Sequence, residues 1–127
     1  MNRIIAYIDG YNFYHALNDL RWNRYLWLDY QKLCQGLLKF NQELVMTKYF
    51  TARTTGSAAK RQRQNAYIEA LKTPNYFEII EGRFQDEPYE CPDCKKIRTI
   101  PKEKKTDVNI AVHMICDCFM NKFDYAL

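Results

Sequence analysis

A chain of 127 residues, 47% of them hydrophobic, is long enough to form one domain with its own core and leaves little room for a second. Its formal net charge of +4 permits a polyanionic partner without requiring one, and no stretch is apolar and long enough to span a membrane. Five cysteines, an odd number, argue against a disulfide framework, and with no signal-peptide pattern they predict a cytoplasmic protein.

Strand and helix patterns alternate along the chain, beginning with a short apolar run from Ile4 to Ile8. A continuous run of this kind is typical of a strand buried on both faces of a sheet. A helix is predicted next over residues 11–20, followed by an aromatic, basic connector over residues 22–27. The later predicted elements are, in chain order, a helix capped by Asp29, a strand over residues 44–51, a helix over 58–71, a strand over 75–81 and a helix over 106–121. This alternation predicts an α/β fold with a mostly parallel central sheet and helices on both faces.

Residues 83–104 show no clear period and contain the sequence Cys91-Pro92-Asp93-Cys94. We interpret them as a loop insertion within a single domain that covers residues 1–127.

Asp9 comes directly after the first apolar run and is followed by Gly10. A residue in this position lies at the carboxyl end of a strand, and in open parallel sheets that end faces the ligand crevice. The alternative is a simple strand-to-helix turn, in which the Asp9 carboxylate accepts hydrogen bonds from nearby backbone N–H groups.

Asp107 is the second polar residue of interest, because Thr106 is a suitable N-cap and places Asp107 in the first turn of the last helix. The helix dipole alone favours a carboxylate there, by about 0.3–1 kcal/mol. The helical pattern predicts that an apolar stripe faces the core, with Asp107 at its edge. That stripe consists of Val108, Val112, Ile115 and Phe119. His113 and Asp117 fall on the opposite side, which predicts a solvated histidine and a structural aspartate.

Four stretches together resemble the NYN domain, a PIN-like family of metal-dependent ribonucleases that includes the LabA-like proteins. They are I-D-G-Y-N at the start, T-A-R after the second strand, R-Q-N-A-Y on the helix over 58–71 and E-K-K-T-D-V-N-I-A-V before and within the last helix. The resemblance covers essentially the whole chain. It implies a three-layer, Rossmann-like fold with aspartates gathered at the carboxyl ends of the strands.

The resemblance also implies an active site. Asp9 and Asp107 would bind Mg²⁺ or Mn²⁺, and Asn12 would steady the site by hydrogen bonding. Hard divalent cations take oxygen ligands, and they serve phosphodiester hydrolysis by activating water and neutralising charge on the phosphate.

The chain departs from the family pattern at its end. NYN domains carry a further acidic motif, S-G-D-x-D, after a strand that begins like F-D-Y-A-L, whereas this chain stops at Leu127. We therefore expect either a fragment or a shortened family member, with impaired activity. Asp124 precedes the missing strand and would lie at the far end from the crevice. The edge of the first strand, Ile4 to Ile8, would then be unpaired and would favour a homodimer or a partner segment that completes the sheet.

Four basic residues are candidates for binding RNA phosphates near the crevice: Arg53, Lys60, Arg61 and Arg63. Tyr11, Phe13 and Tyr14 lie near Asp9 in the sequence and are candidates for stacking on bases. The alternatives are a solvated basic helix face and a set of core aromatic residues.

Cys91 and Cys94 have the spacing of half a zinc site, and a second Cys-x-x-Cys is absent from the sequence. Zinc bound within one chain and zinc shared between two chains both remain open. Cys34, Cys116 and Cys118 fall on predicted helices, where a free cysteine is usually a small buried apolar residue.

The function that these patterns favour is metal-dependent cleavage of RNA. A non-catalytic RNA-binding or regulatory NYN module is the main alternative, because the last acidic motif is missing. A phosphohydrolase that forms an aspartyl-phosphate is disfavoured, since such enzymes carry a second aspartate two residues after the first and this chain has Tyr11 there.

Overall fold

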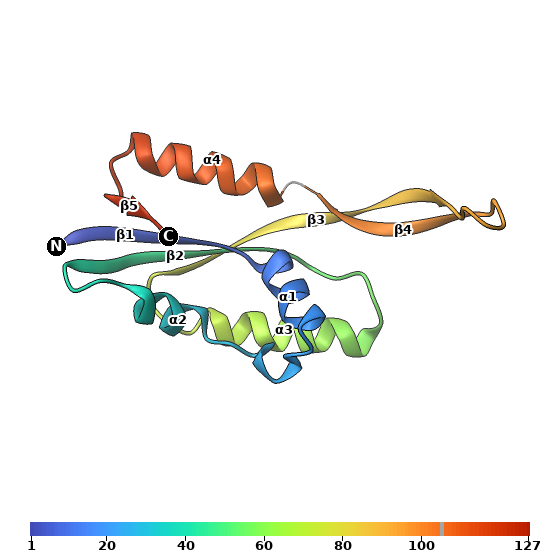
Figure 1. Ribbon diagram of the computed structural model, residues 1–127, viewed down its shortest axis with the longest axis horizontal. Coiled ribbons are helices and arrows are strands. Elements are labelled where there is room, and N and C mark those ends of the chain that lie inside the picture. The colour runs from blue at the N-terminus through green and yellow to red at the C-terminus, as the bar shows by residue number, and fades with distance from the viewer. Residues whose placement is uncertain (105) are drawn as a thin grey trace.

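Four parallel strands form the centre of the molecule (Figure 1). The computed structural model describes residues 1–104 and 106–127. The strands are β1 (Asn2–Asp9), β2 (Gln42–Ala52), β3 (Phe77–Glu90), β4 (Ile97–Lys104) and β5 (Tyr125–Ala126). Their order across the sheet is β4-β3-β2-β1-β5, and β4 alone runs antiparallel to its neighbour. The predicted mostly parallel sheet is confirmed.

Helices cover both faces of this sheet, as the alternating pattern predicted. The helices are α1 (Gly10–Asp19), α2 (Tyr30–Leu37), α3 (Ala58–Leu71) and α4 (Thr106–Phe119), with a short 3-10 helix at Asn23–Tyr25. In Figure 1, α1, α2 and α3 lie on one face of the sheet and α4 lies on the other. Asp29 caps α2 as predicted, its carboxylate accepting a hydrogen bond of 3.1 Å from the Lys32 backbone N–H. None of the helices in residues 1–104 and 106–127 has the length and apolar character needed to cross a membrane.

The main core lies between the sheet and the three helices on its first face. Ala6 and Ile8 of β1 and Tyr49 of β2 are buried there against Tyr30 of α2 and Leu71 of α3. The Tyr30 and Tyr49 rings lie 5.0 Å apart, so aromatic packing forms the centre of this core.

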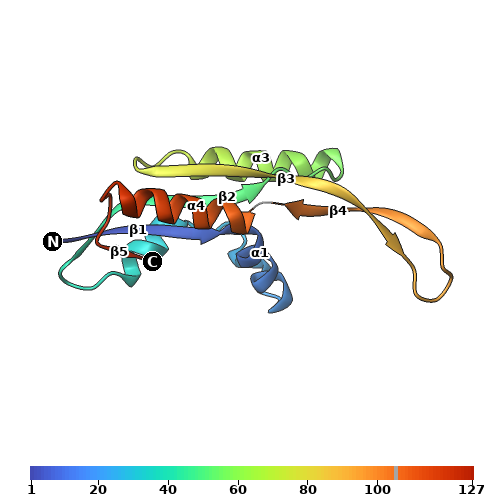
Figure 2. The same ribbon diagram turned by 90° about the horizontal axis from the view of Figure 1, so that it is seen from above.

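The predicted loop over residues 83–104 is wrong, because most of it forms an antiparallel hairpin. The second half of β3 pairs with β4, from Arg83 opposite Lys104 to Glu90 opposite Ile97. Figures 1 and 2 show this hairpin extending beyond the rest of the sheet. The described side chains of the hairpin, at residues 87–100, are exposed or only partly buried, so the sequence there need not alternate between polar and apolar residues.

The predicted burial of α4 is also wrong. The apolar stripe of this helix is exposed, with Val108 at 62% and Phe119 at 87% exposed. Thr106 and Asp117 are buried instead. Cys116 and Cys118 are exposed as well, whereas Cys34 is buried as expected.

The end of the chain pairs with β1, which corrects the expectation of an unpaired edge. Ile4 and Ile5 lie opposite Tyr125 and Ala126 of β5, and the Tyr7 N–H donates to the Leu127 carbonyl over 2.9 Å. Just before β5, Asp124 forms an ion pair of 3.0 Å with Arg3, at the opposite end of β1 from Asp9, as predicted.

Candidate functional site

Asp9 is the last residue of β1 and also the N-cap of α1. Its Oδ1 accepts a hydrogen bond of 3.1 Å from the Asn12 backbone N–H, and its Oδ2 accepts one of 2.8 Å from the Asn12 side-chain amide. The carboxylate thus stays half-buried at the carboxyl edge of the sheet, held in one orientation by Asn12. The two interpretations of Asp9, as a helix cap and as a crevice residue, are both compatible with this geometry.

Gly10 allows α1 to begin directly against the core. A Cβ atom at this position would lie only 2.4 Å from Cζ of the buried Tyr49 ring. Only a residue without a side chain fits there, so Gly10 sets the position of the first turn of α1 and of Asp9 before it.

Asp107 lies in the first turn of α4 and is exposed. In both views the first turn of α4 lies beside the carboxyl end of β1 and the start of α1 (Figures 1 and 2). Asp9 and Asp107 are therefore brought to the same edge of the sheet. Within the described part of the chain, three or more His, Cys, Asp or Glu side chains do not gather anywhere to hold a metal ion. The two carboxylates offer the hard oxygen donors that Mg²⁺ and Mn²⁺ prefer, as a partial ligand set.

A pocket of about 860 Å³ opens at this edge, between α1, α3 and the end of β2. Gly10 lines it, so the pocket begins at the residue after Asp9. Aromatic side chains form much of its wall: Tyr11, Tyr14, Trp27, Tyr30, Tyr49 and Tyr67. Burial raises the pKa of the last three tyrosines, which therefore stay neutral. Tyr67 ends the stretch R-Q-N-A-Y and Trp27 ends the aromatic connector, but the sequence patterns gave neither of them a place in a binding site.

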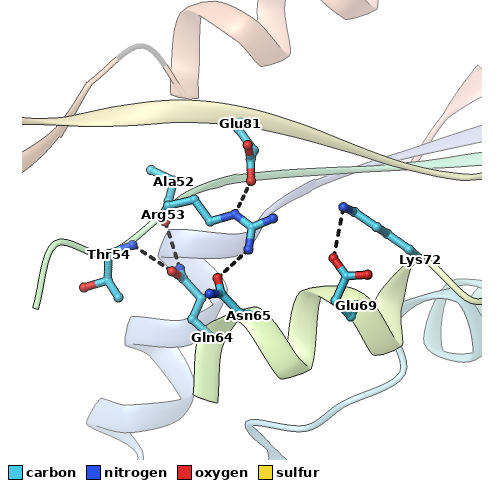
Figure 3. A network of polar contacts seen from close by, with 8 residues as sticks. All are labelled: Ala52, Arg53, Thr54, Gln64, Asn65, Glu69, Lys72 and Glu81. Atoms are coloured by element: carbon cyan, nitrogen blue, oxygen red, sulfur yellow. Dashed lines mark hydrogen bonds and ion pairs between the residues drawn. The ribbon is translucent and has the colours of Figure 1, made fainter. Parts of the chain in front are cut away.

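The four predicted basic residues fall into different environments. Lys60 and Arg63 line the pocket, and Arg61 does not. Arg53 forms an ion pair with Glu81 of β3 and donates a hydrogen bond of 2.6 Å to Asn65 of α3 (Figure 3). The Arg53 guanidinium thus connects a strand to a helix.

Gln64 holds the loop that borders the pocket. Its side-chain amide donates to the Ala52 carbonyl over 2.8 Å and accepts from the Thr54 N–H over 2.7 Å (Figure 3). These two bonds join α3 to the chain just after β2, next to the pocket-lining Thr54 and Thr55. The pocket wall is therefore fixed by polar contacts as well as by packing.

A second polar cluster lies on the other face of the sheet, beneath α4. Lys48 of β2 is only 5% exposed, and its Nζ lies 2.7 Å from Oδ2 of Asp117, which is 2% exposed. The Tyr7 hydroxyl donates to the same oxygen over 2.8 Å, and Nδ1 of His113 lies 3.1 Å from the Lys48 Nζ. Asp117 is thus structural, as predicted, whereas His113 contacts the sheet through Lys48 instead of being solvated.

The pKa of Asp117 reflects two opposing effects. Burial alone would raise it, but the hydrogen bonds from Lys48 and Tyr7 outweigh burial and leave it below its ordinary value. The carboxylate therefore stays charged and paired near neutral pH. A lysine between Thr47 and Tyr49, inside a predicted strand, is the sequence signal that could have pointed to this cluster.

A comparison with known proteins finds sequence similarity to a curated enzyme. No protein-family model and no solved structure matches the chain. The chain is 30% identical, over 159 aligned positions, to 6-hydroxy-3-succinoylpyridine 3-monooxygenase HspA of Pseudomonas putida. The alignment takes in 98% of this chain and 50% of that protein, so the chain spans about half the length of this relative.

Proposed function

We propose that this chain is a Rossmann-like domain of the NYN type that binds single-stranded RNA and cleaves it with Mg²⁺ or Mn²⁺. The observation that carries the proposal is the aromatic, basic pocket that opens next to Asp9, at the edge that Asp107 shares. Such a combination suits a nucleotide strand, because bases stack on aromatic rings and phosphates bind cations.

Each group in the site has a separate role in this proposal. Lys60 and Arg63 hold phosphates, and the exposed rings of Tyr11 and Trp27 stack on bases. Asp9 and Asp107 provide oxygen ligands, and Asn12 keeps the Asp9 carboxylate oriented. A bound divalent ion would supply an activated water and neutralise charge on the scissile phosphate.

Asp9→Asn is expected to lower cleavage of a fluorescently labelled single-stranded RNA in Mn²⁺ by at least about 100-fold, since a direct ligand matters more than an outer-shell partner. Asparagine caps helices as well as aspartate does, so the unfolding midpoint should barely change and the loss can be assigned to chemistry. Asn12→Ala should cost about 10–100-fold, because it removes only the side chain that orients Asp9. EDTA should abolish cleavage by the unmodified chain. RNA binding with no metal-dependent cleavage would instead identify a non-catalytic RNA-binding module.

The salt dependence of RNA binding should show which of the basic residues contact phosphate groups. Each phosphate contact on single-stranded RNA contributes about 0.7 to the slope of log K against log salt, so Lys60→Gln with Arg63→Gln should lower it by about 1.4. Arg61→Gln is the matched control, since Arg61 is on the same helix but outside the pocket lining, and it should leave the slope nearly unchanged. Fluorescence anisotropy over a salt series measures both. Equal effects of the two substitutions would rule out the pocket as the binding site.

A second candidate function comes from the relative. Its name specifies a hydroxylated pyridine that carries a succinoyl acid group, and such a molecule also combines a planar ring with an anion. In this alternative the pocket binds a small heteroaromatic acid, with the ring against the tyrosines and Trp27 and the carboxylate on Lys60 or Arg63. Calorimetric titration with 6-hydroxy-3-succinoylpyridine tests it. Binding of that compound without binding of RNA would favour this candidate over the first.

A further inference from the structure

The turn between β3 and β4 holds two cysteines in a defined conformation. The Cys91 N–H donates to the Lys96 carbonyl over 2.9 Å, and the Lys95 N–H donates back to the Cys91 carbonyl over 2.9 Å. Lys95 adopts a left-handed conformation with φ of 60°, which closes the turn. Pro92 restricts the backbone between the two cysteines.

Cys91 and Cys94 are separated by two residues within this closed turn. This is the spacing at which two cysteines of structural zinc sites commonly bind one ion. The thiolate is the form of cysteine that binds metals.

The chain does not complete this site by itself. Structural zinc takes four cysteine or histidine ligands in a tetrahedron. Among the side chains that the structure describes, which leave out residues 83–86 and 101–105, no third His, Cys, Asp or Glu joins Cys91 and Cys94. The other cysteines are on α2 and α4, and Figures 1 and 2 both show the hairpin carrying its tip away from those helices.

A second copy of the chain offers the missing pair. Two hairpin tips related by a two-fold axis would present four equivalent sulfur atoms, and two-fold symmetry is the commonest arrangement of protein dimers. Cys91 is partly exposed and Cys94 exposed, so both are open to a partner. A zinc ion with four thiolates carries a net charge of −2, and Lys95 and Lys96 of each copy would bring positive charge beside it.

We propose that Cys91 and Cys94 of two copies bind one Zn²⁺, which joins the chains through the tips of their hairpins. This site does not depend on the pocket or on any activity there. It would hold the two bodies apart, because each hairpin extends away from its own body.

Zinc titration of the reduced, metal-free chain tests the proposal, with mass measured by light scattering and metal content by elemental analysis. The expected result is half a zinc ion per chain, with conversion of monomer to dimer and reversal by a chelator. Cobalt in place of zinc should give the strong visible absorption of a tetrahedral thiolate site. Cys91→Ser and Cys94→Ser should each prevent dimerisation, and circular dichroism should show that the body stays folded.

Cys116→Ser with Cys118→Ser is the matched control, because these two cysteines are exposed but lie on α4. It should keep both the metal and the dimer. One zinc per monomer, no zinc binding by the reduced chain, or a zinc-bound dimer that survives Cys91→Ser would each overturn the proposal.

Discussion

Lys48→Met is expected to lower the free energy of unfolding by about 3–5 kcal/mol, because it leaves the buried Asp117 carboxylate without its main counter-charge. The remaining partners of Asp117 are the Tyr7 hydroxyl and Lys122, whose Nζ is 3.4 Å away and half exposed. These partners do not replace a buried ammonium group at 2.7 Å. Urea denaturation followed by circular dichroism measures the change.

An apolar replacement of the whole cluster is the control for this prediction. Lys48→Met combined with Asp117→Leu and Tyr7→Phe removes the charges together with the hydroxyl that would lose its partner. Replacing a buried ion pair by apolar residues of similar volume is often neutral or stabilising, so this variant should recover most of the lost stability. If Lys48→Met alone costs less than about 1 kcal/mol, Lys48 and Asp117 are not a buried pair in solution.

The same cluster predicts the response to acid. The pKa of Asp117 in the folded chain lies below the value of about 3.9 in an unfolded chain. Its contribution to stability is therefore complete above that value and is lost as the pH falls through the folded-state pKa. The unmodified chain should lose stability more steeply below pH 4 than the triple apolar variant does.

Gly10→Ala is expected to destabilise the protein by about 1–3 kcal/mol, the usual cost of forcing extra volume into a packed site. The added Cβ would overlap the Tyr49 ring, which is buried between Gly10 and Tyr30 and cannot move outward freely. Because Gly10 follows Asp9, the substitution should also weaken the proposed binding of RNA by shifting the first turn of α1 at the pocket wall.

Gly36→Ala provides the matched control, since no atom lies within 4 Å of a Cβ built at this position in the last turn of α2. Alanine favours helix over glycine, so this change should be neutral or stabilising by up to about 1 kcal/mol. Thermal unfolding of the two variants side by side distinguishes overlap at one site from a general effect of glycine replacement. Similar midpoints for both would contradict the proposed contact between Gly10 and Tyr49.

The sequence by itself determined the elements whose signals are local. The run Ile4–Ile8 predicted β1, and Asp29 predicted the start of α2, because a continuous apolar run and a capping side chain act on their immediate neighbours. The alternation of strands and helices then led to the parallel sheet. Asp9 and Asp107 were located for the same reason, since each follows from its position at the end of a strand or the start of a helix.

Only the tertiary structure decided which surfaces meet. α4 turns its apolar stripe outward because Lys48, on a distant strand, holds Asp117 beneath the helix, and a helical wheel contains no information about that strand. Arg53 does not line the pocket with Lys60 and Arg63, and its guanidinium is paired with Glu81, which comes from β3. The hairpin over residues 83–104 escaped prediction because its described side chains, at residues 87–100, are not buried, and unburied strands impose no alternation on their sequence. Contacts between residues far apart in the chain are set by tertiary packing. A local sequence pattern shows only which side chains are present, not which distant residues they contact.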